Sequence, residues 1–177
     1  MKKLLFTLLL AVILPLSASA YWPYGNGFRD VTVDVTARGG YNLLEKSPMA
    51  SGVVGVQFYG VRAELELGWT NFDIGANFNK KDFFFVSPMI GWSYGFNHTV
   101  YLMGGISNWA EMSYDTNPKG EPTFNNTLCG KLKVGGNLYI SEHFFVNVDV
   151  SYLLPFARHQ TLSYEGFIVG AGIGYRF

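Results

Sequence analysis

The sequence predicts an all-β protein, an eight-stranded antiparallel up-and-down β-barrel that crosses a membrane. Apolar and polar residues alternate along most of the chain after residue 20, as they do in strands with two different faces. Aromatic residues make up 17% of the chain and 21 residues are glycine, while no long apolar run follows residue 20. This composition favours a membrane barrel over a helical membrane protein.

The chain begins with the pattern of a secretory signal peptide over residues 1–20. Lys2 and Lys3 precede an apolar stretch at 4–16, and Ala18-Ser19-Ala20 provides a small-residue cleavage site. The apolar stretch is shorter than the roughly 20 residues that a spanning helix needs, so an uncleaved anchor is the less favoured alternative. We therefore expect a cleaved leader, a periplasmic segment at 21–29 and one barrel over 30–177.

Eight segments of alternating polarity are expected to be strands, at 30–43, 51–59, 61–70, 83–95, 98–108, 127–140, 143–154 and 163–177. The connections between them alternate between short turns and longer polar loops. The short ones fall at 59–60, 95–97 and 141–142, and the longer ones at 44–50, 71–82, 109–126 and 155–162. Short turns at one rim and long loops at the other are typical of a transmembrane barrel with both termini on the periplasmic side.

Each strand sets an apolar face against a polar one. In 30–43 and 61–70, valine, alanine and leucine alternate with charged residues, and 127–140 and 143–154 repeat this pattern. The segments 51–59, 83–95 and 98–108 alternate in the same way. In 163–177 the second face carries mainly glycine, with Arg176 near its end. Pro88 lacks a backbone donor inside the fourth strand, which predicts a bulge or a shifted register there.

The apolar faces are expected to point outward into lipid. They carry almost no charge, and large aromatics lie on them near the strand ends, as in interfacial girdles. These aromatics are Tyr41, Phe58, Trp69, Phe84, Tyr94, Phe144, Tyr152 and Tyr175, with Phe177 beyond them. The alternative is a soluble lipocalin-like barrel with the apolar face inward around a ligand.

The polar faces would then gather charged residues in the lumen. The expected inward residues are Asp34, Arg38, Arg62, Glu64, Glu66, Lys131, Lys133, Asp149 and Arg176. Because unpaired buried charges are costly, we expect a salt-bridge network that plugs the barrel, with a conducting path as the alternative. Arg38, Glu66, Lys133 and Asp149 are expected at one depth, and barrel closure makes Asp34 and Arg176 neighbours.

The loop at 109–126 is the candidate surface for a partner. It contains more apolar residues than solubility requires, namely Trp109, Met112, Tyr114 and Phe124. Nucleic acid is not expected as a partner, because the 13 basic residues less Lys2 and Lys3 face 13 acidic ones.

Together with the leader and the alternation, the ending Tyr175-Arg176-Phe177 resembles the small eight-stranded outer-membrane barrels. These include the outer-membrane protein X and adhesin relatives and the membrane domain of outer-membrane protein A. The resemblance implies a location in the outer membrane of a Gram-negative bacterium, in contact with its lipid. It implies that Phe177 belongs to a signal read by the barrel-assembly machinery. It also implies a structural, adhesive or host-interaction role, or a tight barrel with little conductance.

The sequence offers little support for catalysis, and it predicts no cofactor. Lipid A deacylases among such barrels place a histidine two residues before a Ser-Asn pair, whereas Ser107-Asn108 follows Gly105 here. Without that base the serine would not be activated. His159 with Ser163 and Glu165 is a commonplace loop composition, and Asp115 and Glu121 match no calcium-loop spacing. We therefore expect a non-enzymatic protein without a metal site.

Overall fold

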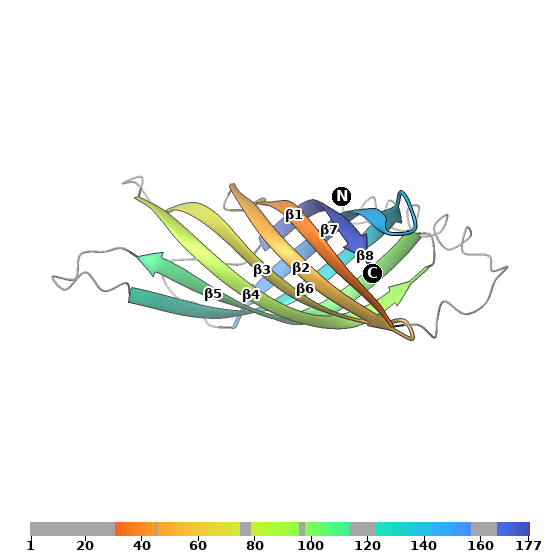
Figure 1. Ribbon diagram of the computed structural model, residues 1–177. Coiled ribbons are helices and arrows are strands. Elements are labelled where there is room, and N and C mark those ends of the chain that lie inside the picture. The colour runs from red at the N-terminus through yellow and green to blue at the C-terminus, as the bar shows by residue number, and fades with distance from the viewer. Residues whose placement is uncertain (1–30, 45, 75–78, 96–97, 114–122, 157–165) are drawn as a thin grey trace, which may run out of the picture.

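A computed structural model describes residues 31–44, 46–74, 79–95, 98–113, 123–156 and 166–177. The leader and the segment at 21–29 lie outside these residues. The described chain forms a closed barrel of eight antiparallel strands, which confirms the predicted fold class (Figure 1). The strands are β1 (Thr32–Asn42), β2 (Ser47–Phe58), β3 (Val61–Ile74), β4 (Asn79–Tyr94), β5 (His98–Ser113), β6 (Thr123–Tyr139), β7 (Phe144–Pro155) and β8 (Gly166–Arg176).

Each strand pairs with the next in the chain, and β1 pairs with β8 to close the barrel. Closure satisfies the backbone groups that a free sheet edge would leave unpaired in lipid. The hairpin between β2 and β3 is the tightest connection. Tyr59 and Gly60 both have positive φ, at 49° and 79°, as in the type I′ turns that match the twist of paired strands.

Two expected loops are mostly strand. β3 and β4 stay paired as far as Ile74 and Asn79, and β5 and β6 as far as Ser113 and Thr123. The predictions of loops at 71–82 and 109–126 were therefore wrong over much of their length. In β3 the face that is apolar up to Trp69 continues with Asn71 and Asp73, so the pattern used for the prediction ends there, although backbone pairing does not need it. Figure 1 shows the start of β4 reaching about as far at this end of the barrel as the end of β5 and the start of β6.

The predicted bulge at Pro88 is absent. The register between β4 and β5 is the same at Val86↔Asn108 and at Met89↔Gly105, so no residue is inserted between them. On its other side Pro88 lies opposite Leu65 in an uninterrupted ladder with β3. The barrel therefore accommodates the missing donor without a shift of register.

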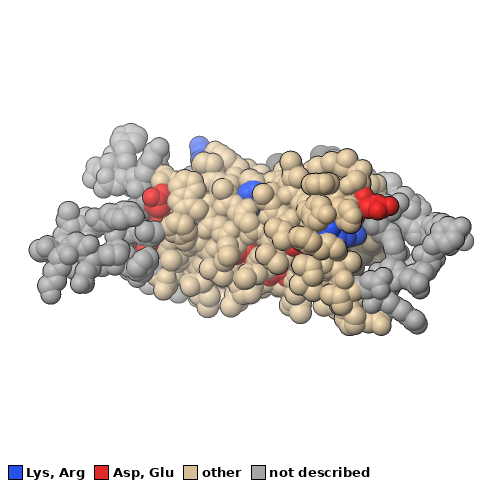
Figure 2. Space-filling model, viewed as in Figure 1, with Lys and Arg blue, Asp and Glu red and all other residues tan. Residues whose placement is uncertain are grey.

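Apolar side chains cover the outside of the barrel, and charged ones lie inside. Leu65 and Leu132 are 43% and 52% exposed, whereas Glu66 and Lys133 are 0% and 1% exposed. Figure 2 shows an outer wall with few charged atoms along the middle of the molecule in this view. This arrangement is that of a barrel in lipid and the opposite of the lipocalin-like alternative. Within the described residues, no helix is long and apolar enough to cross a membrane.

Candidate functional site

Two layers of side chains lie at different heights in the lumen. The ionic layer occupies the middle of the barrel. It consists of Asp34, Arg38, Arg62, Glu64, Glu66, Lys131, Lys133 and Asp149, all of them buried. The apolar layer lies nearer the end that carries the β3–β4, β5–β6 and β7–β8 connections, here named the loop end. It consists of Met49, Phe83, Phe85, Trp109, Cys129, Leu153 and Ile168.

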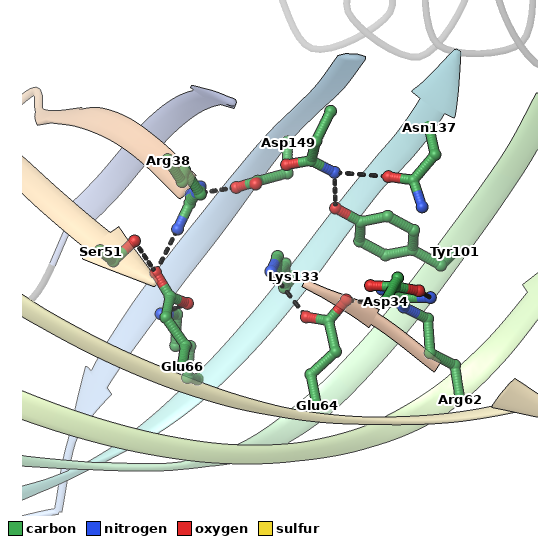
Figure 3. Close-up of polar contacts among 12 residues, drawn as sticks. Asp34, Arg38, Ser51, Arg62, Glu64, Glu66, Tyr101, Lys133, Asn137 and Asp149 are labelled. Atoms are coloured by element: carbon green, nitrogen blue, oxygen red, sulfur yellow. Dashed lines mark hydrogen bonds and ion pairs between the residues drawn. The ribbon is translucent and has the colours of Figure 1, made fainter. Parts of the chain in front are cut away.

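One half of the ionic layer is a chain of four charged groups that starts on β6. The Lys131 Nζ atom lies 2.7 Å from Glu66 Oε2, and the other oxygen of Glu66 accepts from Arg38. Arg38 in turn donates to Asp149 (Figure 3). Ser51 adds a hydrogen bond from Oγ to Glu66 Oε1 of 2.9 Å. The chain therefore links β6, β3, β1 and β7 across the lumen.

The other half of the ionic layer repeats the same order of residue types, Lys, Glu, Arg and Asp. It lies closer to the turn end, which is the end that carries the β2–β3, β4–β5 and β6–β7 connections. Lys133 Nζ lies 2.7 Å from Glu64 Oε2, and Arg62 Nε lies 2.6 Å from Glu64 Oε1. Arg62 also binds Asp34 in a bidentate manner, at 2.7 and 2.8 Å. This geometry is the strong fork-to-carboxylate arrangement of arginine.

Each chain contains two cations and two carboxylates, so each is neutral by itself. Alternation of sign places every charge next to an opposite one, which offsets the cost of removing it from water. β3 and β6 are not neighbours in the sheet, so the Lys131–Glu66 and Lys133–Glu64 pairs connect separated parts of the wall. The ionic layer thus fills the lumen and ties its walls together.

Tyr101 packs against the two cations of the second chain. The guanidinium of Arg62 and the ammonium of Lys133 lie 5.5 and 5.6 Å from its ring centroid. Its hydroxyl accepts from Asn147 Nδ2 at 2.7 Å, and Asn147 also donates to Asn137 at 2.8 Å. The sequence analysis did not single out Tyr101 or Asn147. Strand alternation places both side chains on the inward face, and this parity of position was the signal that could have found them.

Glycines in the wall leave room for the charged side chains. A Cβ atom on Gly55 would lie 2.5 Å from Arg62 Nη2 and 2.6 Å from Asp34 Oδ1. Gly170 faces the Arg38 guanidinium in the same way, and Gly135 faces Asp149 and Tyr101. The inward glycines are therefore spaces for the ion pairs, and the glycine-rich face of β8 has this role beside Arg38.

Equal depth and neighbouring strands do not by themselves identify the ion-pair partners. Lys131 rather than Lys133 contacts Glu66, because the side chains reach across the barrel rather than along one depth. Asp34 and Arg176 do lie opposite each other on β1 and β8, but the ion-pair partner of Asp34 is Arg62. Arg176 is half-buried and donates to the Tyr139 hydroxyl, with its guanidinium carbon 4.0 Å from the centroid of that ring.

The expected interfacial aromatics lie on the outside of the strands. Tyr41, Phe58, Trp69, Phe84, Tyr94 and Phe144 are exposed, and Tyr152 and Tyr175 are partly covered. The partial cover comes from other outward rings. Tyr175 contacts Phe144 and Phe177 at 5.0 Å between ring centroids, and Tyr152 contacts Phe167 at 4.8 Å. Trp92 and Phe167 are further exposed aromatics that parity could have identified.

The candidate interaction loop is smaller than expected. Trp109 lies in β5 and is 0% exposed inside the barrel, so its assignment to a surface loop was wrong. Its side chain faces inward by strand parity, which the polar surroundings in the sequence hid. The backbones of Met112 and Phe124 belong to β5 and β6, and Tyr114 lies outside the described residues.

Ser107, the serine of the incomplete deacylase pattern, faces the lumen. It is fully buried, and its Oγ atom lies 2.6 Å from Ser87 Oγ in a hydrogen bond. Cys129 is also fully buried, inside the apolar layer. Among the residues that the structure describes, no group of three His, Cys, Asp or Glu side chains could hold a metal ion.

Comparison with known proteins places this barrel among outer-membrane proteins. The solved structure of OprG from Pseudomonas aeruginosa is similar, with a TM-score of 0.61 and 10% identity over 84% of this chain and 96% of that one. The barrel domain of OprF from Pseudomonas aeruginosa has a TM-score of 0.57 and 16% identity, over 82% and 97%. Neisserial surface protein A has a TM-score of 0.57 and 10% identity, over 82% and 94%.

These identities establish a common fold only, and no curated protein sequence matches the chain. The family assignment comes from the sequence itself, because residues 6–177 match the outer membrane protein beta-barrel domain. The match covers almost the whole chain, including all eight strands. The chain therefore belongs to the outer membrane protein beta-barrel family.

Proposed function

We propose that this protein is a closed, non-enzymatic barrel that anchors surface segments in the outer membrane, rather than a pore or a lipid-modifying enzyme. One observation carries the proposal, which is that buried side chains of an ionic and an apolar layer fill the lumen. An eight-stranded barrel has an interior just wide enough for side chains to fill. A protein that transports ions would need to keep part of this space free for water.

The surroundings of Ser107 support a role without catalysis. A lipid-modifying enzyme must present its nucleophile to a lipid at the membrane surface, next to a base. Ser107 instead lies inside the barrel against Ser87, two residues after Gly105.

A surface role is supported by the loop end of the barrel. β4, β5 and β6 extend past β1 and β2 at this end, and the extensions of β5 and β6 would lift their connection at 114–122 away from the membrane (Figure 1). The Neisserial relative of the same fold carries the name of a surface protein. In this proposal the leader is cleaved, the turn end faces the periplasm, and Phe177, which is 71% exposed, takes part in assembly.

Planar-bilayer recording tests the closed lumen. The purified, refolded chain is expected to give no conductance steps above the baseline of the bilayer, while an open porin recorded in the same lipid gives clear steps. Stable steps from the refolded chain would instead favour the alternative of a small ion channel. Mass spectrometry of lipid A, from cells with and without the protein, tests the enzyme alternative, and a modified lipid A species would overturn our proposal.

Labelling of introduced cysteines tests the surface role. Asn117→Cys lies in the β5–β6 connection, and Ser141→Cys lies in the exposed turn between β6 and β7. A membrane-impermeant maleimide is expected to label the first in intact cells and the second only after the outer membrane is opened. The unsubstituted protein is the control, because its single cysteine, Cys129, is buried. The reverse pattern would contradict the proposed orientation.

A further inference from the structure

The apolar layer has properties that the ionic layer lacks. Its side chains come from β2, β4, β5, β6, β7 and β8. The two other strands contribute glycines at this height, since Gly40 lies against Ile168 and Met49 and Gly68 lies against Phe85. Six strands therefore contribute apolar side chains to this layer, and the other two approach it with glycines.

Two large rings close the centre of this layer. Phe85 and Trp109 are stacked, with ring centroids 4.7 Å apart and planes inclined by 22°. Both side chains are fully buried, as are Cys129 and Leu153 beside them. Gly68 lies opposite Phe85 in the β3–β4 ladder, and the Phe85 ring occupies the space that a side chain on Gly68 would need.

The boundary between the two layers is sharp. Lys131 Nζ, which pairs with Glu66 in the ionic layer, lies 5.4 Å from the centroid of the Phe85 ring. On one side of this ring an ion would meet carboxylates, ammonium groups and hydroxyls that can replace its water. On the other side it would first meet the carbon atoms of the apolar layer and the thiol of Cys129, which cannot compensate for lost hydration. The buried polar side chains of Asn42, Ser47, Thr70 and Glu111 follow nearer the loop end.

We infer that the apolar layer, which contains Phe85 and Trp109, is the barrier that keeps ions out of this barrel. The ionic layer alone would not keep them out. Apolar constrictions exclude ions by remaining dry, even where their diameter would admit water. The ionic layer holds its strands together and fills space, but its charged groups offer solvation. The inference rests on the proposed closed barrel and assigns its closure to particular residues.

Conductance of two pairs of variants tests the inference. Phe85→Ser and Trp109→Ser place a polar group in the apolar layer and remove a ring, and each is expected to raise conductance at least tenfold above the unsubstituted protein. Phe85→Leu keeps the layer apolar and is the matched control, expected to stay at baseline. Glu66→Gln removes one charge from the ionic layer and keeps its shape, and it is also expected to stay at baseline.

The reactivity of the native thiol provides a second measurement. It can be made even where only a small fraction of a variant folds. Cys129 lies in the apolar layer, so a small water-soluble methanethiosulfonate should react with it in Phe85→Ser and not in Phe85→Leu. Heat-modifiable migration on a gel selects the folded fraction of each variant. A thiol equally unreactive in both folded variants would overturn the inference.

The outcomes separate this inference from the proposed function. Conductance of the unsubstituted protein would overturn the closed barrel itself. A closed unsubstituted protein whose Phe85→Ser and Trp109→Ser variants are folded and also closed would overturn only the role of the apolar layer. Opening by Glu66→Gln would likewise overturn it, because the ionic layer would then be a barrier by itself.

Discussion

The two layers of the lumen differ in what holds each of them together. The ionic layer consists of Lys–Glu–Arg–Asp chains in which each group needs its neighbour, so the loss of one leaves others buried without a partner. The apolar layer depends on contact between surfaces that do not require a particular partner. The first should therefore be sensitive to the removal of single atoms, and the second mainly to the loss of volume.

The largest effect is expected from breaking the first ionic chain. Glu66→Ala removes the partner of Lys131 and of Arg38, together with the acceptor of Ser51. Leaving buried charges uncompensated should lower the free energy of unfolding by about 3–5 kcal/mol. Urea unfolding of the refolded barrel in lipid vesicles measures this. Glu142→Ala, in the exposed turn after β6, is the control and should change stability little.

The apolar layer should respond to a loss of volume by a smaller amount. Leu153→Ala leaves a cavity beside Cys129 and Ile168, and we expect a loss of about 2–4 kcal/mol in the same unfolding experiment. Leu154→Ala is the matched control, because Leu154 faces outward and lipid chains can fill the space left behind. Equal costs for the two leucines would contradict the packed layer.

The glycines of the ionic layer offer a sharper test of its geometry. In Gly55→Ala the new methyl group meets the Arg62–Asp34 pair, and overpacking of this kind should cost about 1–3 kcal/mol. In Gly52→Ala, on the same strand, the new methyl group meets no atom within 4 Å. The free energy of unfolding should then stay within about 0.5 kcal/mol of the unsubstituted value. A similar cost for both substitutions would mean that the Arg62–Asp34 pair does not occupy the lumen as described.

The smallest effect is expected at the pair of serines that bridges β4 and β5. Ser87→Ala leaves the buried Ser107 hydroxyl without this partner and should cost about 1 kcal/mol. Replacing both serines by alanine should recover most of that loss, since neither polar group then remains. A double-mutant cycle by urea unfolding measures the coupling. Additive costs would show that the two hydroxyls do not interact.

Parity explains how much of the site could be read from the sequence. A strand sends alternate side chains to opposite faces, so one correctly oriented face places Asp34, Glu64 and Lys131 in the lumen. Parity does not say which inward groups touch across the barrel. The Lys131–Glu66 pair, and the choice of Arg62 rather than Arg176 for Asp34, depend on strand tilt and on the reach of each side chain.

Loop lengths were the weaker part of the prediction, for a related reason. The outward face of β3 becomes polar at Asn71 and Asp73, and Asn71 donates to Asp82 on β4 at 2.7 Å. Polar residues with backbone pairing look like loops in a sequence because no apolar face marks them. This also misplaced Trp109, which belongs to the buried apolar layer rather than to a surface loop.

The sequence by itself determined the barrel, its strand number and which faces of the strands point outward. The reason is that alternation with a period of two separates an apolar face from a polar one. The tertiary structure alone decided that the charges form two separate chains and that an apolar layer with Phe85 and Trp109 lies on their loop side. The physical reason is that alternation is a local property of each strand. Contacts across the lumen arise only when strands far apart in the chain are closed into one cylinder.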